Sequence, residues 1–192
     1  HRRMVSRELA HRVKNSLATA QAVFKHSLRG ATDLDDARDK AMGRIQAMSA
    51  AQDLLTRESL DSADLSDVVE EALKPFRSFD IRIDGPQIAL QEKGVSAFIL
   101  ALYELATNSL KYGALSADAG SVRVQWWISD DDPDRFLFEW IEQGGPPVSE
   151  PKRRGFGRSI LEGLTPTDLG GTATLSFEPT GVRYALDAPL PA

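Results

Sequence analysis

The chain contains no cysteine among its 192 residues. This absence excludes disulfide bonds, thiolate metal sites and cysteine nucleophiles, and it fits the reducing cytoplasm, where we expect the protein to work. The sequence also lacks a run of about 18 apolar residues, the length that a helix needs to span a bilayer. It has 28 Asp and Glu against 23 Lys and Arg. Because positive charges are not in excess, the composition argues against a nucleic acid as the partner.

Proline is absent from residues 1–58, and glycine occurs there only as Gly30 and Gly43. Apolar side chains recur at every third or fourth position in two series, which predicts two amphipathic helices. The series are Val5, Leu9, Val13, Leu17, Ala20, Phe24 and Leu28, then Leu34, Ala37, Ala41, Ile45, Met48 and Leu55. Gly30 is expected to end the first helix, and Thr32 or Asp33 to cap the second. The pattern predicts an antiparallel helical hairpin.

A lone hairpin of this kind leaves one apolar face uncovered. We therefore expect it to pair with a second copy of the chain, as a homodimer, or with another domain that would leave a monomer. The first expected helix is already under way at His1, so we also expect a longer protein with a sensor region upstream.

After the hairpin, the pattern of apolar and polar residues changes to one that predicts both helices and strands. Three further helices are expected, one from Asp64 or Ser66 to Leu73, one over 95–112 and one near 158–164. Alternating apolar and polar residues predict strands at 81–83, 122–128, 135–141, 172–177 and 182–186. Helices kept apart from hairpin-linked strands predict an α+β sandwich.

Four short strings carry candidate chemistry, and the first surrounds His11. On a helical wheel His11 points away from the apolar face, among small and polar neighbours. It is either a solvated surface histidine or an exposed imidazole nucleophile.

The second string places four polar or aromatic side chains within 100° of a helix, namely Glu104, Asn108, Lys111 and Tyr112. The bland interpretation is a solvated stripe. The alternative is a magnesium–nucleotide site, with Asn108 as oxygen ligand of Mg²⁺, Lys111 as phosphate partner and Tyr112 as a ring beside the base. Glu104 would then orient a water molecule or accept a proton.

The third string, around Glu142 and Gly144, is either a plain strand end or an adenine contact, with the carboxylate accepting a hydrogen bond from the adenine amino group. The fourth holds Gly155 and Gly157 at a helix start between arginines, a pattern suited to binding an anion. Each string alone is weak evidence for a function, whereas the occurrence of all four in this order is a much more specific signal.

These strings, in this order, resemble bacterial sensor histidine kinases of the HWE group or its close relatives, over 7–189. The strings are His11-Arg12-Val13-Lys14-Asn15, the run from Glu104 to Ser116 (Glu-Leu-Ala-Thr-Asn-Ser-Leu-Lys-Tyr-Gly-Ala-Leu-Ser), the run from Trp140 to Val148 (Trp-Ile-Glu-Gln-Gly-Gly-Pro-Pro-Val) and the run from Gly155 to Leu161 (Gly-Phe-Gly-Arg-Ser-Ile-Leu). The resemblance implies a dimerisation and histidine-phosphotransfer hairpin over 1–60. It implies a catalytic ATP-binding domain of the GHKL (Bergerat) type over 61–192, with an ATP lid between Gly145 and Arg154.

The implied site residues are His11 as phosphoacceptor, Asn108 at Mg²⁺, Glu142 and Gly144 at adenine, and Gly155 and Gly157 over the phosphates. Three positions depart from the family pattern. Tyr103 stands where the HWE group has its eponymous histidine, and Arg12 replaces the usual acidic neighbour of the phosphoacceptor. Val182 replaces a threonine that often contacts ATP in the family. The base that activates His11 is therefore left open between Glu8 and Glu104.

The function that the resemblance implies is an ATP-dependent protein-histidine kinase. It would phosphorylate His11 from Mg-ATP and pass the phosphoryl group to an aspartate of a response-regulator receiver domain. Two alternatives remain at this point. One is a histidine phosphotransferase relay with a degenerate ATP-binding domain, and the other is a GHKL ATPase.

Overall fold

The computed structural model describes residues 20, 21, 25, 33–58, 62–151 and 155–191. The string around His11 and nearly all of the first expected helix lie outside these residues. Helix α2 (Leu34–Glu58) is the second helix of the predicted hairpin. It begins after Asp33, whose side chain accepts a hydrogen bond from the backbone N–H of Asp36 at 2.9 Å, so the predicted N-cap is confirmed.

The chain forms two compact units, and the boundary between them falls between Met48 and Ser49, inside α2. The second unit is built on a five-stranded sheet. The strands lie in the order β2 (Ile81–Asp84), β4 (Ser121–Ile128), β5 (Arg135–Gln143), β7 (Gly181–Pro189) and β6 (Thr172–Glu178). Strands β2 and β4 run parallel, and the other neighbours are antiparallel. All five strands coincide with strands predicted from alternation.

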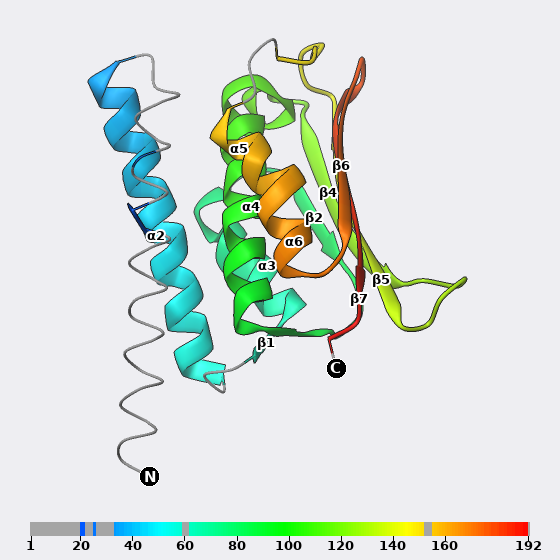
Figure 1. The fold of residues 1–192 in the computed structure, drawn as a ribbon. Coiled ribbons are helices and arrows are strands. Elements are labelled where there is room, and N and C mark those ends of the chain that lie inside the picture. The colour runs from blue at the N-terminus through cyan, green and yellow to red at the C-terminus, as the bar shows by residue number, and fades with distance from the viewer. Residues whose placement is uncertain (1–19, 22–24, 26–32, 59–61, 152–154, 192) are drawn as a thin grey trace. The chain divides into compact units, whose positions relative to one another are not determined.

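Helices cover one face of this sheet (Figure 1). They are α3 (Leu65–Leu73), α4 (Glu92–Tyr112), α5 (Phe156–Ser159) and α6 (Thr165–Asp168), with short helical turns η1 (Lys74–Phe76), η2 (Ala114–Ser116) and η3 (Ile160–Leu164). The side chain of Asp64 caps α3 by accepting a hydrogen bond from the N–H of Ser66 at 2.8 Å. Pro75 follows α3 directly, as expected for a helix stop. The predicted α+β sandwich is confirmed.

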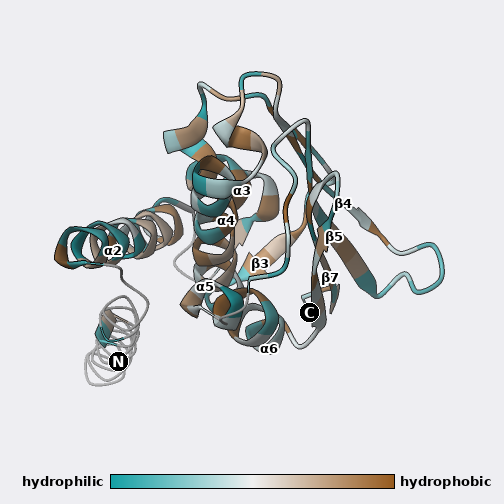
Figure 2. Cartoon of the chain, turned by 90° about the horizontal axis from the view of Figure 1, so that it is seen from above, coloured by the Kyte–Doolittle hydropathy of each residue, from teal (hydrophilic) through white to brown (hydrophobic). Residues whose placement is uncertain are grey.

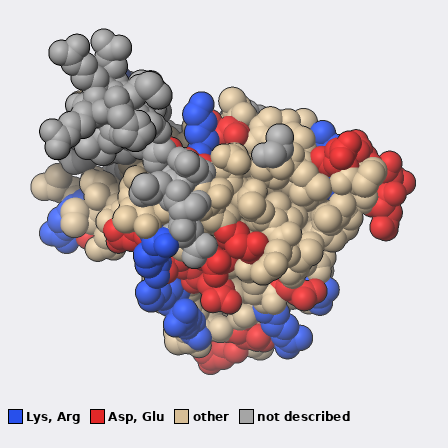
Figure 3. Space-filling model, turned by 90° about the horizontal axis from the view of Figure 1, so that it is seen from below, with Lys and Arg blue, Asp and Glu red and all other residues tan. Residues whose placement is uncertain are grey.

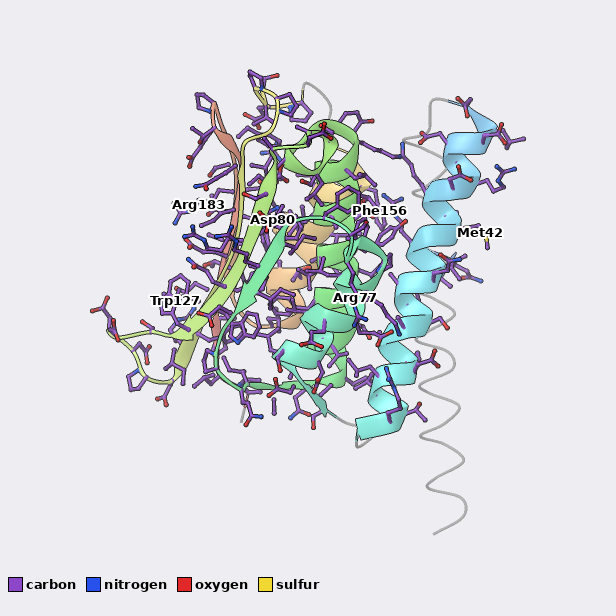
Figure 4. The ribbon with its side chains drawn as sticks, turned by 180° about the vertical axis from the view of Figure 1, so that it is seen from behind. Met42, Arg77, Asp80, Trp127, Phe156 and Arg183 are labelled. Atoms are coloured by element: carbon purple, nitrogen blue, oxygen red, sulfur yellow. The ribbon has the colours of Figure 1, made fainter. Side chains whose placement is uncertain are left out.

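The core lies between α4 and the sheet. Phe98 of α4 meets Phe138 of β5 edge to face, with ring centroids 5.0 Å apart, and Trp126 of β4 stacks on Phe138. Hydrophobic and hydrophilic residues follow one another along the strands (Figure 2), because successive side chains of a strand point to opposite faces. Trp127 and Arg183 accordingly lie on the face away from the helices (Figure 4).

The last helical segment is longer than predicted, because α5, η3 and α6 run on to Asp168. Within it, the N–H of Thr165 donates to the carbonyl of Ile160, five residues back, which makes η3 a π turn. Pro166 follows at the start of α6. A proline in a helix has no N–H to donate and its ring collides with the carbonyl four residues earlier. The wider π turn gives that ring room.

Two further features concern the surface. Four exposed aspartates, Asp130, Asp131, Asp132 and Asp134, gather at the turn between β4 and β5 (Figure 3). Among the residues that the structure describes, no helix has both the length and the apolar character that crossing a bilayer requires.

Two short strands were not expected. β1 (Ser62–Asp64) and β3 (Ala89–Gln91) form a separate antiparallel pair. They frame α3 and α4, since β1 leads directly into the first helix and β3 into the second.

Candidate functional site

The C-terminal part of α4 carries the four residues of the second string. Asn108, Lys111 and Tyr112 are exposed, and Tyr112 keeps 68% of its surface. Glu104 does not share this exposure, because only 4% of its surface is accessible. The bland interpretation, a solvated stripe, therefore does not hold at Glu104. The wheel gives the direction of a side chain and not what packs over it.

Glu104 is covered by the start of α5. A Cβ atom placed on Gly157 would lie 2.6 Å from Oε2 of Glu104 and 3.6 Å from Nδ2 of Asn108. The bare glycine backbone thus lies directly against a buried carboxylate and an exposed carboxamide. Three residues taken from two separate strings of the sequence, Glu104, Asn108 and Gly157, come together at one point of the fold.

Gly155, at the N-cap of α5, has a different environment. Its backbone is extended, with φ −84° and ψ 174°, and no atom of the described residues lies within 4 Å of a Cβ placed there. The two glycines of the fourth string therefore differ. Gly157 is packed against α4, whereas Gly155 faces open space.

The arginines around these glycines are only partly described. Arg153 and Arg154 lie outside the described residues. The guanidinium of Arg158 is held by carboxylates, with Nε 2.6 Å from Oε2 of Glu162 and Nη1 2.5 Å from Oε1 of Glu150. The hydrogen bonds to Glu162 and to Glu150 raise the pKa of Arg158. Glu150 belongs to the expected lid, so an ion pair ties this part of the lid to α5.

Glu142 lies at the end of β5, and only 3% of its surface is accessible. Its Oε2 accepts a hydrogen bond from the backbone N–H of Ala114 at 2.8 Å, and its Oε1 accepts one from the indole Nε1 of Trp140 at 3.1 Å. Burial raises the pKa of Glu142, and hydrogen bonds from Ala114, Trp140 and Ser109 oppose that rise. Both carboxylate oxygens are thus engaged within the domain.

Gly144 has a left-handed backbone with φ +73°, which favours glycine. A Cβ atom on it would lie 2.5 Å from the carbonyl oxygen of Ala119. The neighbouring Gly145 is as crowded, because its Cβ would lie 2.6 Å from the Cα of Ala114. The glycines after β5 therefore allow this loop to pack on the segment that follows α4.

The sequence alone therefore located the α4 and α5 residues of one cluster, but it missed the residues around Glu142. Ser109, Gly113 and Ala114 belong to the second string but were given no role there, although Ser109 is almost fully buried at 1% accessibility. The only signal available was the glycine that directly follows α4. His11, the candidate nucleophile, lies outside the described residues.

Comparisons with known proteins also find histidine kinases. Residues 8–87 match the family model described as HWE histidine kinase. The blue-light-activated histidine kinase of Brucella anthropi is 38% identical over 193 residues, covering 98% of this chain and 39% of the relative. The blue-light-activated histidine kinase of Brucella ovis is 36% identical over 97% of this chain, again covering 39% of the relative. The chain thus spans about two fifths of the length of these relatives.

Among solved structures, the blue-light activated histidine kinase of Erythrobacter litoralis EL346 superposes with a TM-score of 0.67 at 16% identity, over 95% of this chain and 58% of that one. The histidine kinase domain of the same protein gives 0.63 at 14% identity, over 78% and 74%. The fold is therefore shared with these histidine kinase structures. The resemblance seen in the sequence is confirmed, since the chain is similar to the HWE histidine kinase model over residues 8–87 and to blue-light-activated histidine kinases over nearly its whole length.

Proposed function

We propose that this chain is the phosphotransfer core of a protein-histidine kinase of a two-component system. An imidazole nitrogen of His11 would attack the γ-phosphorus of ATP, so that a P–N bond forms while the bond to the β,γ-bridging oxygen breaks and ADP leaves. The imidazole proton passes to a base, for which Glu8 and Glu104 are the candidates. The phosphoryl group then moves to an aspartate of a receiver domain.

The observation that carries the proposal is the contact of Gly157 with Glu104 and Asn108. The packing of Gly157 on α4 sets the start of α5 beside the exposed carboxamide of Asn108. A glycine lets phosphate oxygens approach the backbone closely, and Gly155, two residues earlier, leaves room for that approach. Phosphoryl transfer depends mainly on positioning and on neutralising charge. The contact supplies positioning, and the exposed ammonium of Lys111, one turn further along α4, supplies charge.

The same side chains fit Mg²⁺. Asn108 offers an exposed carboxamide oxygen beside the backbone of Gly157, and magnesium prefers few protein ligands alongside phosphate and water oxygens. When bound, Mg²⁺ would offset the charge of the β- and γ-phosphates. Asn108 would hold it, Gly155 and Gly157 would border the phosphates, and the ring of Tyr112 and the backbone at Gly144 would border the base.

The domain assignment is part of the proposal. Residues 1–60 would form the dimerisation and phosphotransfer hairpin, and 61–192 the ATP-binding domain, since α2 ends at Glu58 and β1 begins at Ser62. Large apolar side chains support dimerisation through the hairpin. Met42 and Ile45, three residues apart on α2, keep 51% and 39% of their surface exposed. We further propose a cytoplasmic core with its sensor region upstream.

The test is incubation of the protein with γ-labelled ATP and Mg²⁺. We expect label that is lost in acid and stable in alkali, as for phosphohistidine. His11→Ala should abolish it and leave nucleotide affinity within about twofold, while the matched control His26→Ala should keep it. Binding without any label, with phosphate released to water, would instead indicate a GHKL ATPase. A chain that binds no nucleotide but accepts a phosphoryl group from a phosphorylated receiver would be a relay.

A further inference from the structure

Trp140 is a fully buried residue of β5 whose indole N–H serves a carboxylate. Its Nε1 lies 3.1 Å from Oε1 of Glu142, and the two residues share one face of the sheet because they stand two apart on the strand. On the neighbouring strands Val124 and Tyr184 stand directly opposite Trp140, and both are fully buried. The ring is therefore packed from both sides, so its N–H points in a fixed direction.

The carboxylate of Glu142 receives two further donors from α4 and the turn after it. Its Oε2 accepts a hydrogen bond from the N–H of Ala114 at 2.8 Å, and the hydroxyl of Ser109 donates a third hydrogen bond to the carboxylate. That hydroxyl oxygen accepts from the N–H of Leu115 at 3.2 Å, so its own proton can point at the carboxylate. An ionised carboxylate has about four acceptor sites. The domain thus occupies three of them, and about one is left for a ligand.

The three donors also influence the charge of Glu142. Burial favours the neutral carboxyl group and raises its pKa, whereas the donors favour the charged form and oppose the rise. A charged carboxylate can only accept hydrogen bonds. Its remaining site therefore suits a ligand group that donates, such as the 6-amino group of adenine. It disfavours the 6-oxo oxygen of hypoxanthine or guanine, because two acceptors repel each other.

We propose that Trp140 is a positioning residue for nucleotide selection, and that Ser109 assists it. The indole and the hydroxyl fill two acceptor sites of Glu142 and hold the carboxylate so that its remaining site receives the amino group of adenine. The inference rests on the proposed function, because it takes the adenine contact implied for Glu142 to be made by a bound nucleotide. It goes beyond that contact, since it assigns the choice between 6-amino and 6-oxo purines to a tryptophan that is too deeply buried to touch the nucleotide.

Replacing Trp140 by phenylalanine isolates the role of the indole N–H. Trp140→Phe keeps an aromatic ring in the core and removes the donor. The carboxylate of Glu142 then has two vacant sites, is free to turn, and loses a partner that favours its charged form. Once protonated, the carboxyl group can itself donate to a 6-oxo oxygen. We therefore expect weaker binding of a 6-amino purine and unchanged or tighter binding of a 6-oxo purine.

The experiment titrates the chain with Mg-ADP and with Mg-IDP in a calorimeter, since neither nucleotide carries a γ-phosphoryl group to transfer. In IDP an oxo group replaces the amino group at position 6 of the purine. The wild type should bind ADP at least tenfold more tightly than IDP. Trp140→Phe should bind ADP about tenfold more weakly and IDP within about twofold, so that the ratio of the two affinities falls about tenfold. A parallel fall for both nucleotides would show that the indole serves only the fold and would overturn the proposal, as would an unchanged ratio.

The matched control is Trp126→Phe on the neighbouring strand β4. Trp126 is also buried, at 2% accessibility, and its Nε1 donates to the carbonyl of Pro86 at 2.7 Å. The control variant loses the same atoms from the core and the same kind of hydrogen bond, but it leaves the donors of Glu142 in place. Its ratio of ADP to IDP affinity should stay within about twofold of the wild type. An equal fall of the ratio in both tryptophan variants would overturn the proposal.

Ser109→Ala tests the same carboxylate from α4, and it decides the question if Trp140→Phe does not fold. Losing this hydroxyl should lower the ratio of ADP to IDP affinity about threefold. An unchanged ratio in this variant counts against the proposal. A wild-type chain that binds neither diphosphate would remove the proposed function itself. A wild type that binds ADP and IDP equally would leave the nucleotide site standing and overturn only the role of Trp140.

Discussion

Gly157 of α5 lies so close to Glu104 of α4 that a Cβ atom at position 157 would stand 2.6 Å from Oε2 of that carboxylate. The two residues come from strings more than fifty positions apart. Their contact brings the glycine backbone to Asn108 as well, and it is the feature on which the proposed nucleotide site depends.

This contact predicts different outcomes for the two glycines of the fourth string. Gly157→Ala should lower the free energy of unfolding by about 1–3 kcal/mol, because the methyl group pushes a buried carboxylate out of its place. Gly155→Ala meets open space at a backbone conformation that alanine adopts, so stability should stay equal or rise by about 0.4–1 kcal/mol. Urea unfolding of both variants checks this. Equal losses in the two would mean that Gly157 is not packed on Glu104.

Asn108 is exposed, so its replacement should affect binding and not folding. Asn108→Ala should weaken nucleotide binding in magnesium by about tenfold or more, because the carboxamide oxygen is the proposed ligand of the metal. Calorimetric titration with a non-hydrolysable ATP analogue measures this effect. The same titration in EDTA is the control, and there the variant and the wild type should differ little. Unchanged affinity in magnesium would remove Asn108 from the site.

Much of the fold could be predicted because its elements carry strong local patterns. The strands of the sheet alternate apolar and polar residues over long enough runs, and Asp33, Asp64 and Pro75 mark helix ends by their own chemistry. The strands β1 and β3 were not predicted, because three residues are too few to show an alternation of apolar and polar side chains. The continuation of the last helical segment beyond Leu164 was not predicted, because a proline such as Pro166 normally ends a helix. In the structure a π turn precedes Pro166.

The sequence identified candidate residues of the site, but it did not reveal which of them contact one another. The helical wheel placed Glu104 beside Asn108 correctly, yet nothing local reveals that Gly157 covers it. Likewise, nothing local reveals that the carboxylate of Glu142 accepts a hydrogen bond from the N–H of Ala114. That contact depends on a glycine 29 positions before Glu142, which leaves room for the oxygen.

The burial of Glu142 also predicts how stability changes with pH. Burial raises its pKa above the ordinary 4.5 in the folded protein, so between these two values the folded state binds more protons than the unfolded one. The contribution of Glu142 to stability is then fully present below pH 4.5 and is lost as pH rises through the folded pKa. The loss amounts to about 1.4 kcal/mol for each tenfold change in proton affinity.

Glu142→Gln cannot titrate, so the difference in free energy of unfolding, wild type minus variant, should fall as pH rises from about 4.5 through the raised pKa of Glu142. Urea unfolding at several pH values measures this difference.

Glu71→Gln is the control, because the pKa of Glu71 is shifted in the opposite direction. Burial alone would raise the pKa of Glu71, but the hydrogen bond from Arg57 and the charge of Lys74 outweigh burial and lower it. The corresponding difference for Glu71 should therefore stay flat above about pH 5 and fall only in acid. A flat difference for Glu142→Gln would mean that its carboxylate is as well solvated in the folded protein as in the unfolded chain, contrary to the buried pairing with Ala114 and Trp140.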